Sequence, residues 1–576
     1  WRIIADGSTY LAHAVGAGKT MTMAAAIMEQ RRLGLIAKAM LVVPGHCLAQ
    51  AAREFLALYP SARILVADET NFSKDKRQRF LSRAATATWD AIVITHSAFR
   101  FIAGPAAFER QMIEDELSLY EDLMGRVERD DRVSRKRLER LKEGLKERLE
   151  ALATRKDDLL TISELGIDQI IVDEAQEFRK LSFATNMSTL KGVDPNGSQR
   201  AWDLYVKSRF LEVKNPGRAL VLASGTPITN TLGEMFSVQR LMDHVALKAR
   251  GLHEFDAWAS TFGQISNGWE LDATGVNYKL KSRFASFQNV PELLSMYRSF
   301  ADVVTKGDLD EQAAKAGLRP LTPPVEGGKP FNHVVERSGD QSVYMDQIIH
   351  RMENLPKDPR IDNPLKITND ARKAGLDYRL IDPEAGDNDA SKTNAAVERI
   401  VQIWQDTAAA KGTQLVFCDL STPKWPKGAG GSAPAPVTSG TQGLEFVEED
   451  FAAQVDVESG MEDGLTDAEP GEDPVESGDD DGESTLVDTG EDTSVAADMD
   501  ACVAAGSRFS VYDDMRRKLI ERGIPADEIA FIHDANTDIR KGKLFSDMQA
   551  GRVRVLLGST AKMGAGMNVQ KRLVAA

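Results

Sequence analysis

Two short segments carry residue types that can bind and split a nucleoside triphosphate. The first, residues 13–20, reads His-Ala-Val-Gly-Ala-Gly-Lys-Thr and lies between a short apolar stretch and a run of good helix formers. Its glycines allow the backbone to curl, so that N–H groups face phosphate oxygens at the start of a helix. Lys19 can then reach the β- and γ-phosphates, and Thr20 can ligate Mg²⁺. The nucleotide-contacting residues that we expect in this phosphate loop are Gly16, Ala17, Gly18, Lys19 and Thr20.

The second segment, residues 172–176, reads Val-Asp-Glu-Ala-Gln and ends an apolar, strand-like run. Asp173 can hold the metal through water, and Glu174 can polarise the attacking water. An Asp-Glu pair after a strand is often only a solvated turn. Here the pair follows the phosphate loop in the order that a triphosphatase site requires. We therefore expect Lys19, Asp173 and Glu174 to be catalytic, with Thr20 and Asp173 as the magnesium ligands.

Two further segments place small residues directly after apolar strands. Residues 224–230 read Ser-Gly-Thr-Pro-Ile-Thr-Asn, and residues 558–570 contain Gly-Ser-Thr followed by Met-Gly-Ala-Gly-Met-Asn-Val-Gln. Hydroxyl groups at a strand end can sense whether phosphate is present, and bare glycine backbone can approach phosphates closely. By itself a Ser-Gly-Thr-Pro turn indicates little about function.

The acidity of the chain belongs to a single segment. The whole chain has 71 Lys and Arg against 87 Asp and Glu, a net charge of −16. Residues 441–500 contain 22 of the acidic residues and no Lys or Arg, so the remainder is mildly basic. A mildly basic remainder permits a nucleic-acid partner. The three cysteines are far apart and form no metal-ligand spacing, which fits a reduced, cytoplasmic compartment, and no apolar run is long enough to cross a membrane.

Short, uniformly apolar runs recur along the chain with helical stretches between them. Four of them lie at 40–43, 91–94, 170–172 and 220–222, and a second set lies at 415–417, 529–532 and 553–557. Such runs are typical of parallel strands buried on both faces. The pattern predicts an α/β fold with two lobes, each with a parallel sheet. The expected domains are 1–245, an inter-lobe helical accessory region at 246–330, and a second lobe at 331–576.

Two insertions interrupt these lobes. Residues 106–160 are rich in Glu, Arg, Lys and Leu with helical spacing, so we expect a helical hairpin. It is either a solvated protrusion or an arm that contacts DNA or a partner. Residues 421–507 are rich first in Gly, Ser, Ala and Pro and then in acid, so we expect disorder. This insertion is either a linker or a competitor for the DNA-binding surface.

The order of these motifs resembles superfamily 2 helicases, with two RecA-like lobes. The Gly-Thr-Pro-Ile-Thr-Asn and Gly-Ala-Gly-Met-Asn signatures resemble the Swi/Snf-type translocases. Residues 414–419, 531–536 and 558–570 are most similar to the helicase part of large phage- and plasmid-borne proteins that often carry an adenine-specific DNA methyltransferase. The sequence itself has no Asn-Pro-Pro-Tyr or Asp-Pro-Pro-Tyr signature. Any methyltransferase, fused or associated, is therefore expected outside this chain.

The resemblance implies an ATP- and Mg²⁺-dependent enzyme that moves on DNA and contacts mainly the backbone phosphates. It implies that Gln176, Ser224, Gly225 and Thr226 couple ATP to DNA. Thr560, which shares this coupling role, would line the cleft together with Gly564 and Gly566. His13 departs from the family pattern, because this loop position usually carries glycine or alanine, and a structural role is expected for it. The adenine-reading glutamine and the arginine-bearing motif of the family would lie beyond the two ends of the sequence. We therefore expect a fragment that hydrolyses ATP slowly by itself.

Two alternatives remain at this stage. The enzyme can separate strands instead of moving along duplex DNA, or the chain can be a non-catalytic scaffold that binds DNA or protein. The presence of Lys19, Asp173 and Glu174 argues against the scaffold.

Overall fold

The computed structural model describes most of the chain outside the acidic insertion. The described residues are 1–68, 71–126, 132–154, 160–187, 190, 192–228, 231, 233–271, 278–318, 325–356, 358, 360–423, 509–535, 538–563 and 569–576. The insertion expected to be disordered at 421–507 lies almost wholly outside them, as do Gly564 and Gly566. The chain divides into two units, Trp1–Thr422 with Ser507–Ala576 and Pro423–Gly506. All the elements below belong to the first unit.

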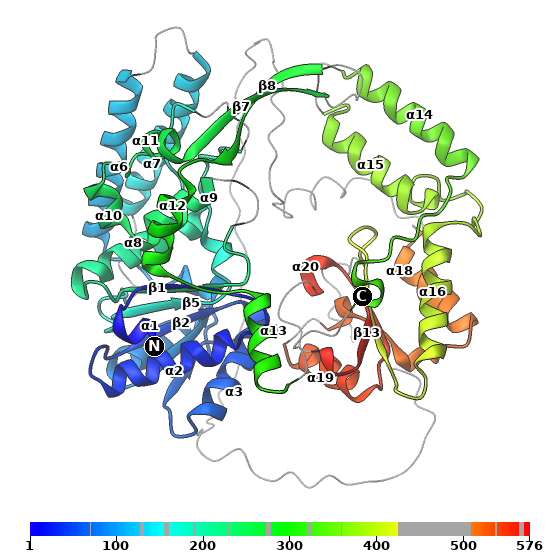
Figure 1. Cartoon of the computed structure of the whole chain (residues 1–576), viewed down its shortest axis with the longest axis horizontal. Coiled ribbons are helices and arrows are strands. Elements are labelled where there is room, and N and C mark those ends of the chain that lie inside the picture. The colour runs from blue at the N-terminus through cyan, green and yellow to red at the C-terminus, as the bar shows by residue number, and fades with distance from the viewer. Residues whose placement is uncertain are drawn as a thin grey trace, which may run out of the picture. The chain divides into compact units, whose positions relative to one another are not determined.

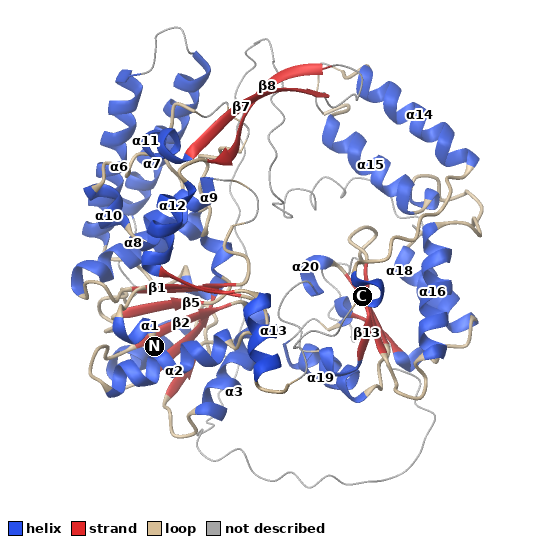
Figure 2. Ribbon diagram, in the orientation of Figure 1, coloured by secondary structure: helices blue, strands red, loops and turns tan. Residues whose placement is uncertain are grey.

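A parallel sheet forms the centre of the N-terminal part (Figures 1 and 2). Among the described residues it has seven strands in the order β3-β4-β2-β5-β6-β1-β9, and every neighbouring pair is parallel. The strands are β1 (Thr9–His13), β2 (Ala39–Val43), β3 (Ile64–Val66), β4 (Ala91–Thr95), β5 (Gln169–Val172), β6 (Leu220–Ser224) and β9 (Ala301–Val304). The α/β fold with parallel sheets that the apolar runs predicted is therefore confirmed.

Alternate residues of the same strand enter different cores. In β2, Met40 and Val42 join one hydrophobic cluster, whereas Leu41 and Val43 join another. Side chains of a strand alternate between its two faces, so a strand covered on both faces must be apolar throughout. This explains the unbroken apolar runs in the sequence. The helices of this part are α1 (Arg2–Ala5), α2 (Lys19–Arg32), α3 (Leu48–Leu58), α4 (Arg77–Thr86), α5 (His96–Phe99), α8 (Gln199–Lys214), α9 (Gly233–Met242), α10 (His244–Ala249), α11 (Phe255–Phe262), α12 (Val290–Phe300) and α13 (Lys306–Lys315).

Two long helices occupy the predicted helical insertion. They are α6 (Ala106–Arg126) and α7 (Arg132–Thr154), and Lys142 of α7 is paired with Glu121 of α6 at 2.8 Å. Leu138, Leu145 and Leu152 are buried in the first hydrophobic cluster, as their spacing predicted. A buried ion pair between Arg240 and Glu116 also ties α6 to α9.

The expectation of a helical region at 246–330 is wrong in two places. The strands β7 (Gly263–Leu271) and β8 (Tyr278–Phe287) form an antiparallel two-stranded ribbon. The strand β9 is an edge strand of the first sheet. The ribbon is rich in polar and small residues, so it has no apolar strand signature. In β9, Asp302 interrupts an apolar run that is only four residues long. Phe284, Tyr297 and Phe300 of this region are buried.

A smaller parallel sheet forms the centre of the C-terminal part, in the order β11-β12-β10-β13. Its strands are β10 (Thr413–Phe417), β11 (Ile529–Phe531), β12 (Val555–Gly558) and β13 (Leu573–Ala575). Val555 and Leu557 face one cluster with α16 and α18, and Leu556 faces another with Met548 of α19. The helices are α14 (Gly339–Glu353), α15 (Pro364–Leu376), α16 (Lys392–Asp406), α18 (Val511–Glu521), α19 (Asp538–Ala550) and α20 (Thr560–Met563). None of the helices among the described residues has the length and apolar content needed to cross a membrane.

An aromatic cluster attaches the ribbon to the first part of the chain. Trp258 of α11 is fully buried, and its ring lies 5.6 Å from Phe236 of α9 and 6.4 Å from both Phe284 and Phe287 of β8. Its Nε1 donates a hydrogen bond of 2.6 Å to Gln239 Oε1. Trp258 is therefore the centre of the attachment.

We predict that Trp258→Ala lowers the free energy of unfolding by about 3–5 kcal/mol, because it leaves a large cavity among packed rings. Denaturant unfolding followed by circular dichroism measures this change. The matched control is Trp1→Ala, since Trp1 is 94% exposed and its loss should cost less than about 0.5 kcal/mol. Equal stabilities of the two variants would contradict the assignment of Trp258 as the centre of the attachment.

A buried histidine makes the C-terminal part sensitive to acid. His533 is buried, its Nε2 has no hydrogen-bond partner among the described residues, and its ring lies 5.6 Å from the ring of Tyr512. Burial, aided by the positive charge of Lys562, lowers the pKa of His533 to about 4. The unfolded chain then binds more protons than the folded chain between pH 6.5 and about 4.

We predict that stability falls as the pH drops from about 6.5 to about 4, with a contribution from His533 of up to about 1.4 kcal/mol per pH unit. The variants His533→Gln and His533→Asn should both reduce this slope, whatever they do to the stability at neutral pH. Thermal unfolding across this pH range measures the slope. A slope that is the same in the wild type and in both variants would contradict the prediction.

Candidate nucleotide site

The phosphate loop joins the end of β1 to the start of α2. Gly16 and Gly18 have φ angles of 88° and 79°, which side chains with a Cβ rarely tolerate, and Gly18 caps α2. The loop is largely exposed, whereas the strand before it is buried. Backbone N–H groups at this helix start remain available for an anion. The geometry is therefore that of a loop shaped to receive phosphate.

Lys19 and Thr20 stand in the first turn of α2. Lys19 is buried, and its Nζ donates to the carbonyl oxygen of His13 over 3.4 Å. A bond of this length is weak, so the ammonium group can leave it for a phosphate oxygen. Thr20 is half-buried beside it.

His13 has a structural partner that the sequence did not indicate. Its Nε2 donates to Asp302 Oδ2 of β9 over 2.9 Å, and the N–H of Ala14 donates to the carbonyl oxygen of Val304 over 2.8 Å. Both bonds hold the start of the phosphate loop against β9. The departure from glycine or alanine at position 13 therefore supplies a contact between the loop and the neighbouring strand.

The acidic pair follows β5 at the same edge of the sheet. Asp173 is buried, and burial together with the nearby Glu174 carboxylate raises its pKa to about 6. The backbone N–H of Glu174, which donates to Asp173 Oδ1, and the charge of Lys19 act in the opposite direction. A buried carboxylate of this kind gains stability when a cation approaches it.

Glu174 adopts a left-handed backbone conformation, with φ 50° and ψ 52°. A residue with a Cβ pays a conformational cost there, so neighbouring contacts must hold the turn. His96 contributes one of them, because its Nε2 donates to the carbonyl oxygen of Asp173 over 2.8 Å. Burial lowers the pKa of His96 to about 4, which keeps the ring neutral near pH 7.

A chain of hydrogen bonds leads from Glu174 to the Ser-Gly-Thr turn at 224–226. Gln176 Nε2 donates to Glu174 Oε2 over 2.8 Å, and Ser224 Oγ donates to Gln176 Oε1 over 2.7 Å. The N–H of Thr226 in turn donates to Ser224 Oγ over 3.0 Å. The two segments are thus joined side chain to side chain.

Gly225 brings the same turn against the phosphate loop. A Cβ on Gly225 would lie 3.1 Å from Val15 Cγ2 and 3.6 Å from the carbonyl oxygen of His13. Any larger residue would therefore press on the loop. The structure brings the phosphate loop, the acidic pair and the Ser-Gly-Thr turn together, as the order of motifs predicted.

Thr560 is the first residue of α20, which follows β12 of the smaller sheet, and Asp419 positions it there. Its N–H donates to Asp419 Oδ1 over 2.6 Å and its Oγ1 donates to Asp419 Oδ2 over 2.9 Å. These bonds join the ends of the neighbouring strands β10 and β12. The expected cleft residues Gly564 and Gly566 lie outside the described residues.

Three residues of these sites were missed from the sequence: His96, Asp302 and Asp419. His96 follows the strand run at 91–94, so its place at a strand end was a usable signal. Asp419 ends the segment 414–419, which was recognised by its resemblance to the family without a role for this residue. Asp302 carries no signal, because its partner is 289 positions away.

The donor groups at this edge fit a magnesium ion bound together with a nucleotide. In the part of the chain that the structure describes, no group of three or more His, Cys, Asp or Glu could hold a metal by itself. Mg²⁺ commonly takes one or two protein oxygens and completes its shell with phosphate oxygens and water. The Asp173 carboxylate and the Thr20 hydroxyl supply donors of that kind.

The chain is similar to a family of known domains and to solved structures. No curated protein matches the chain. Among solved structures, the SWI2/SNF2 ATPase core of Sulfolobus solfataricus in complex with dsDNA is similar, with 12% identity, 96% of this chain and 74% of that chain covered, and a TM-score of 0.28. The SWI2/SNF2 ATPase core domain of the same organism has 13% identity, covers 72% and 62%, and has a TM-score of 0.25. A family model described as a probable helicase domain matches residues 1–305, more than half of the chain. The chain therefore belongs to this family of probable helicase domains.

Proposed function

We propose that this protein is a superfamily 2 translocase or helicase of the Swi/Snf type, which couples ATP hydrolysis to movement on DNA. The observation that carries the proposal is the bonded chain from Glu174 through Gln176 to Ser224, next to the phosphate loop. A site that only bound nucleotide would not need such a chain. A motor does, because the state of the phosphates must reach the DNA-binding surface.

In this proposal each site residue of the N-terminal part has one task. Lys19 leaves the His13 carbonyl oxygen and binds the β- and γ-phosphates, while the loop N–H groups cradle the remaining phosphate oxygens. Thr20 and Asp173 would hold Mg²⁺, which would supply positive charge beside the phosphate oxygens. Glu174 accepts a proton from the attacking water. Hydrolysis then depends on positioning and charge and needs no covalent intermediate.

The Ser-Gly-Thr turn carries the signal away from the nucleotide. Loss of the γ-phosphate changes the charge next to Glu174, and the Glu174–Gln176–Ser224 bonds pass this change to 224–226. Thr560, Gly564 and Gly566 are proposed to complete the cleft from the smaller sheet. These roles rest on their positions in the sequence motifs.

DNA is the proposed partner, contacted mainly through its backbone phosphates. The mildly basic character of the chain outside residues 441–500 supports this partner. The similarity of residues 414–419, 531–536 and 558–570 to phage- and plasmid-borne proteins supports a fused or associated DNA methyltransferase in the cytoplasm. Strand separation remains the second candidate activity. A non-catalytic scaffold is disfavoured because Lys19, Asp173 and Glu174 are all present.

We predict different defects for the two central catalytic substitutions. Lys19→Ala should abolish tight ATP binding and turnover, because it removes the charge on the phosphates. Glu174→Gln should retain ATP binding and lose about 10²–10⁴ in hydrolysis rate, because it removes the base. Fluorescent-nucleotide binding and steady-state phosphate release, measured with duplex DNA present, separate the two defects.

The matched controls are Lys315→Ala and Glu521→Gln, since both side chains are exposed, at 73% and 57%. Both controls should bind and hydrolyse ATP as the wild type does. Wild-type turnover in Glu174→Gln would remove this residue from the mechanism. Wild-type ATP affinity in Lys19→Ala would remove the phosphate-loop assignment.

We also predict that Gln176→Ala and Ser224→Ala lower DNA-stimulated hydrolysis about tenfold and leave ATP affinity unchanged. Each substitution breaks the same bonded chain, so the double variant should be no worse than either single variant. The control is Ser82→Ala on the exposed side of α4. If the two effects multiply in the double variant, the residues do not act as one chain.

A further inference from the structure

The peptide unit between Asp173 and Glu174 is held at both of its polar groups. Its carbonyl oxygen accepts a hydrogen bond from His96 Nε2 over 2.8 Å, and its N–H donates to Asp173 Oδ1 over 3.0 Å. A peptide unit is planar, so a bond that holds its carbonyl oxygen also sets the direction of its N–H. The next rotation along the chain is the φ angle of Glu174, which at 50° lies in the left-handed region. The His96 bond therefore helps to set the direction in which the Glu174 side chain leaves the backbone.

The other hydrogen bonds of Glu174 are weaker supports for this turn. Two of them use groups that have a task in the proposed reaction: the Asp173 carboxylate, assigned to the metal, and the Gln176 amide, assigned to coupling. The third runs from the N–H of Glu177 to the carbonyl oxygen of Glu174 over 3.2 Å, at the long end of the usual range. His96 lies outside the turn and has no assigned contact with phosphate or metal. Its bond can therefore hold the turn throughout the reaction.

The ring of His96 is fixed in the orientation that this bond needs. His96 directly follows β4 and is buried, and Thr95 Oγ1 before it accepts from the N–H of Ala98 over 3.1 Å, which caps α5. The ring lies edge-on to the ring of Phe178, with 5.0 Å between the ring centres. Phe178 is fully buried and follows the acidic pair along the chain. One side chain thus contacts residues on both sides of Glu174.

His96 acts on the acidic pair as a neutral donor. Burial lowers the pKa of its imidazole to about 4, so the ring is uncharged at pH 7. A carbonyl oxygen only accepts hydrogen bonds, so the single ring hydrogen is on Nε2. A neutral ring adds no net charge beside Asp173 and Glu174. Its effect on them is therefore an effect on position.

We propose that His96 is a positioning residue for ATP hydrolysis, whose Nε2–H holds the Asp173 carbonyl oxygen and thereby keeps the Glu174 carboxylate where it can accept the proton of the attacking water. This proposal rests on the proposed function and adds a residue that touches neither nucleotide nor metal. The role requires a hydrogen-bond donor at the place of Nε2 and does not require a ring. A reacting group displaced by about 1 Å can cost about 100-fold in rate. Loss of the bond should therefore lower kcat, whereas ATP affinity depends on the phosphate loop.

Three substitutions of His96 in the full chain separate the hydrogen bond from the packing. In His96→Gln the amide nitrogen can reach the place of Nε2, in His96→Asn it reaches only the place of Nδ1, and His96→Phe keeps a ring against Phe178 without a donor. We predict that kcat with duplex DNA falls about 10- to 100-fold in His96→Asn and His96→Phe, and less than about threefold in His96→Gln. The affinity for a fluorescent ATP analogue should change less than about twofold in all three.

A double-mutant cycle tests whether His96 acts through Glu174. Single-turnover release of radiolabelled phosphate measures the slow rates that this cycle needs. If His96 only places the Glu174 carboxylate, His96→Phe should slow the wild type but change the rate less than about twofold in the Glu174→Gln background. Effects that multiply would show that His96 acts on the rate by another route, and they would overturn the proposal.

A second readout needs no nucleotide. Amide hydrogen exchange of the peptide 172–179, followed by mass spectrometry in the free chain, reports how firmly the turn is held. Exchange should be faster in His96→Asn and His96→Phe than in the wild type and His96→Gln. The Gln and Asn variants both replace the ring by an amide, so a loss of packing alone would affect them equally. Equal exchange and equal kcat in these two variants would overturn the proposal.

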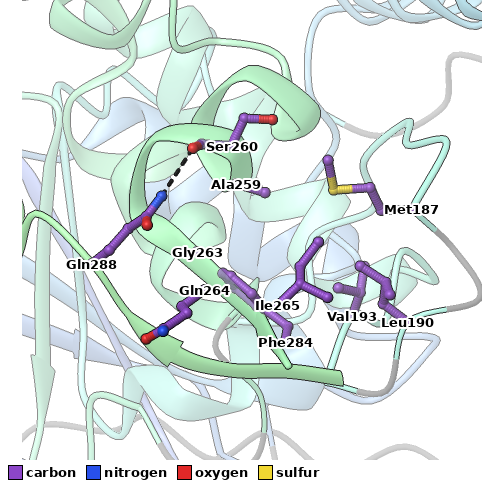
Figure 3. Close-up of a pocket in the computed structure, with 10 residues that line it drawn as sticks. All are labelled: Met187, Leu190, Val193, Ala259, Ser260, Gly263, Gln264, Ile265, Phe284 and Gln288. Atoms are coloured by element: carbon purple, nitrogen blue, oxygen red, sulfur yellow. Dashed lines mark hydrogen bonds between the residues drawn. The ribbon is translucent and has the colours of Figure 1, made fainter. Parts of the chain in front are cut away.

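Gln288 supplies the matched control, because its Nε2 also donates to a backbone carbonyl oxygen, that of Ser260, over 3.1 Å. It lies at a cavity at the base of the ribbon of β7 and β8 (Figure 3). Gln288→Ala should hydrolyse ATP and exchange residues 172–179 as the wild type does. If the wild type hydrolyses no ATP with DNA present, the proposed function fails. Wild-type hydrolysis that persists unchanged in His96→Asn and His96→Phe rejects the role of His96 alone.

Discussion

The backbone hydrogen bonds that place β6 between β5 and β1 are the constraint on which the nucleotide site depends. Because all three strands are parallel, their carboxyl ends meet at one edge of the sheet. That edge receives the phosphate loop from β1, the acidic pair from β5 and the Ser-Gly-Thr turn from β6. The residues are far apart in the sequence, and only this strand order makes their side chains neighbours. Ligand sites at the carboxyl edge are the general property of such sheets.

The strong sequence signals were those of strands buried on both faces. The runs at 40–43, 91–94, 170–172 and 220–222 all became strands, and the glycine and acidic motifs that follow them identified the site. Short strands with a polar residue, such as β9, were not predicted, and neither was the ribbon of β7 and β8, which is rich in polar and small residues. Contacts between individual side chains could not be predicted from the sequence. The bond between His13 and Asp302, for example, joins residues 289 positions apart and has no local sequence pattern.

The acidic pair carries an electrostatic cost that a bound cation would relieve. Asp173 is buried beside another carboxylate, which raises its pKa to about 6, and Glu174 sits in a left-handed turn. Both features carry a conformational or electrostatic cost in a folded protein. His96 and Gln176 hold the turn against that cost. These costs lie beside the phosphate loop. The binding energy of a metal–nucleotide complex at this loop can offset them.

The segment of the chain between β6 and β9 begins and ends beside the phosphate loop and the acidic pair. It starts at Ser224, the last residue of β6, and contains α9, the aromatic cluster, the ribbon of β7 and β8, and α12. It ends in β9, which pairs with β1. Its first residue is bonded to Gln176, and its last strand is bonded to the phosphate loop through Asp302 and Val304. A displacement of this segment is therefore opposed by two sets of contacts, the bond to Gln176 at its start and the bonds to the phosphate loop at its end.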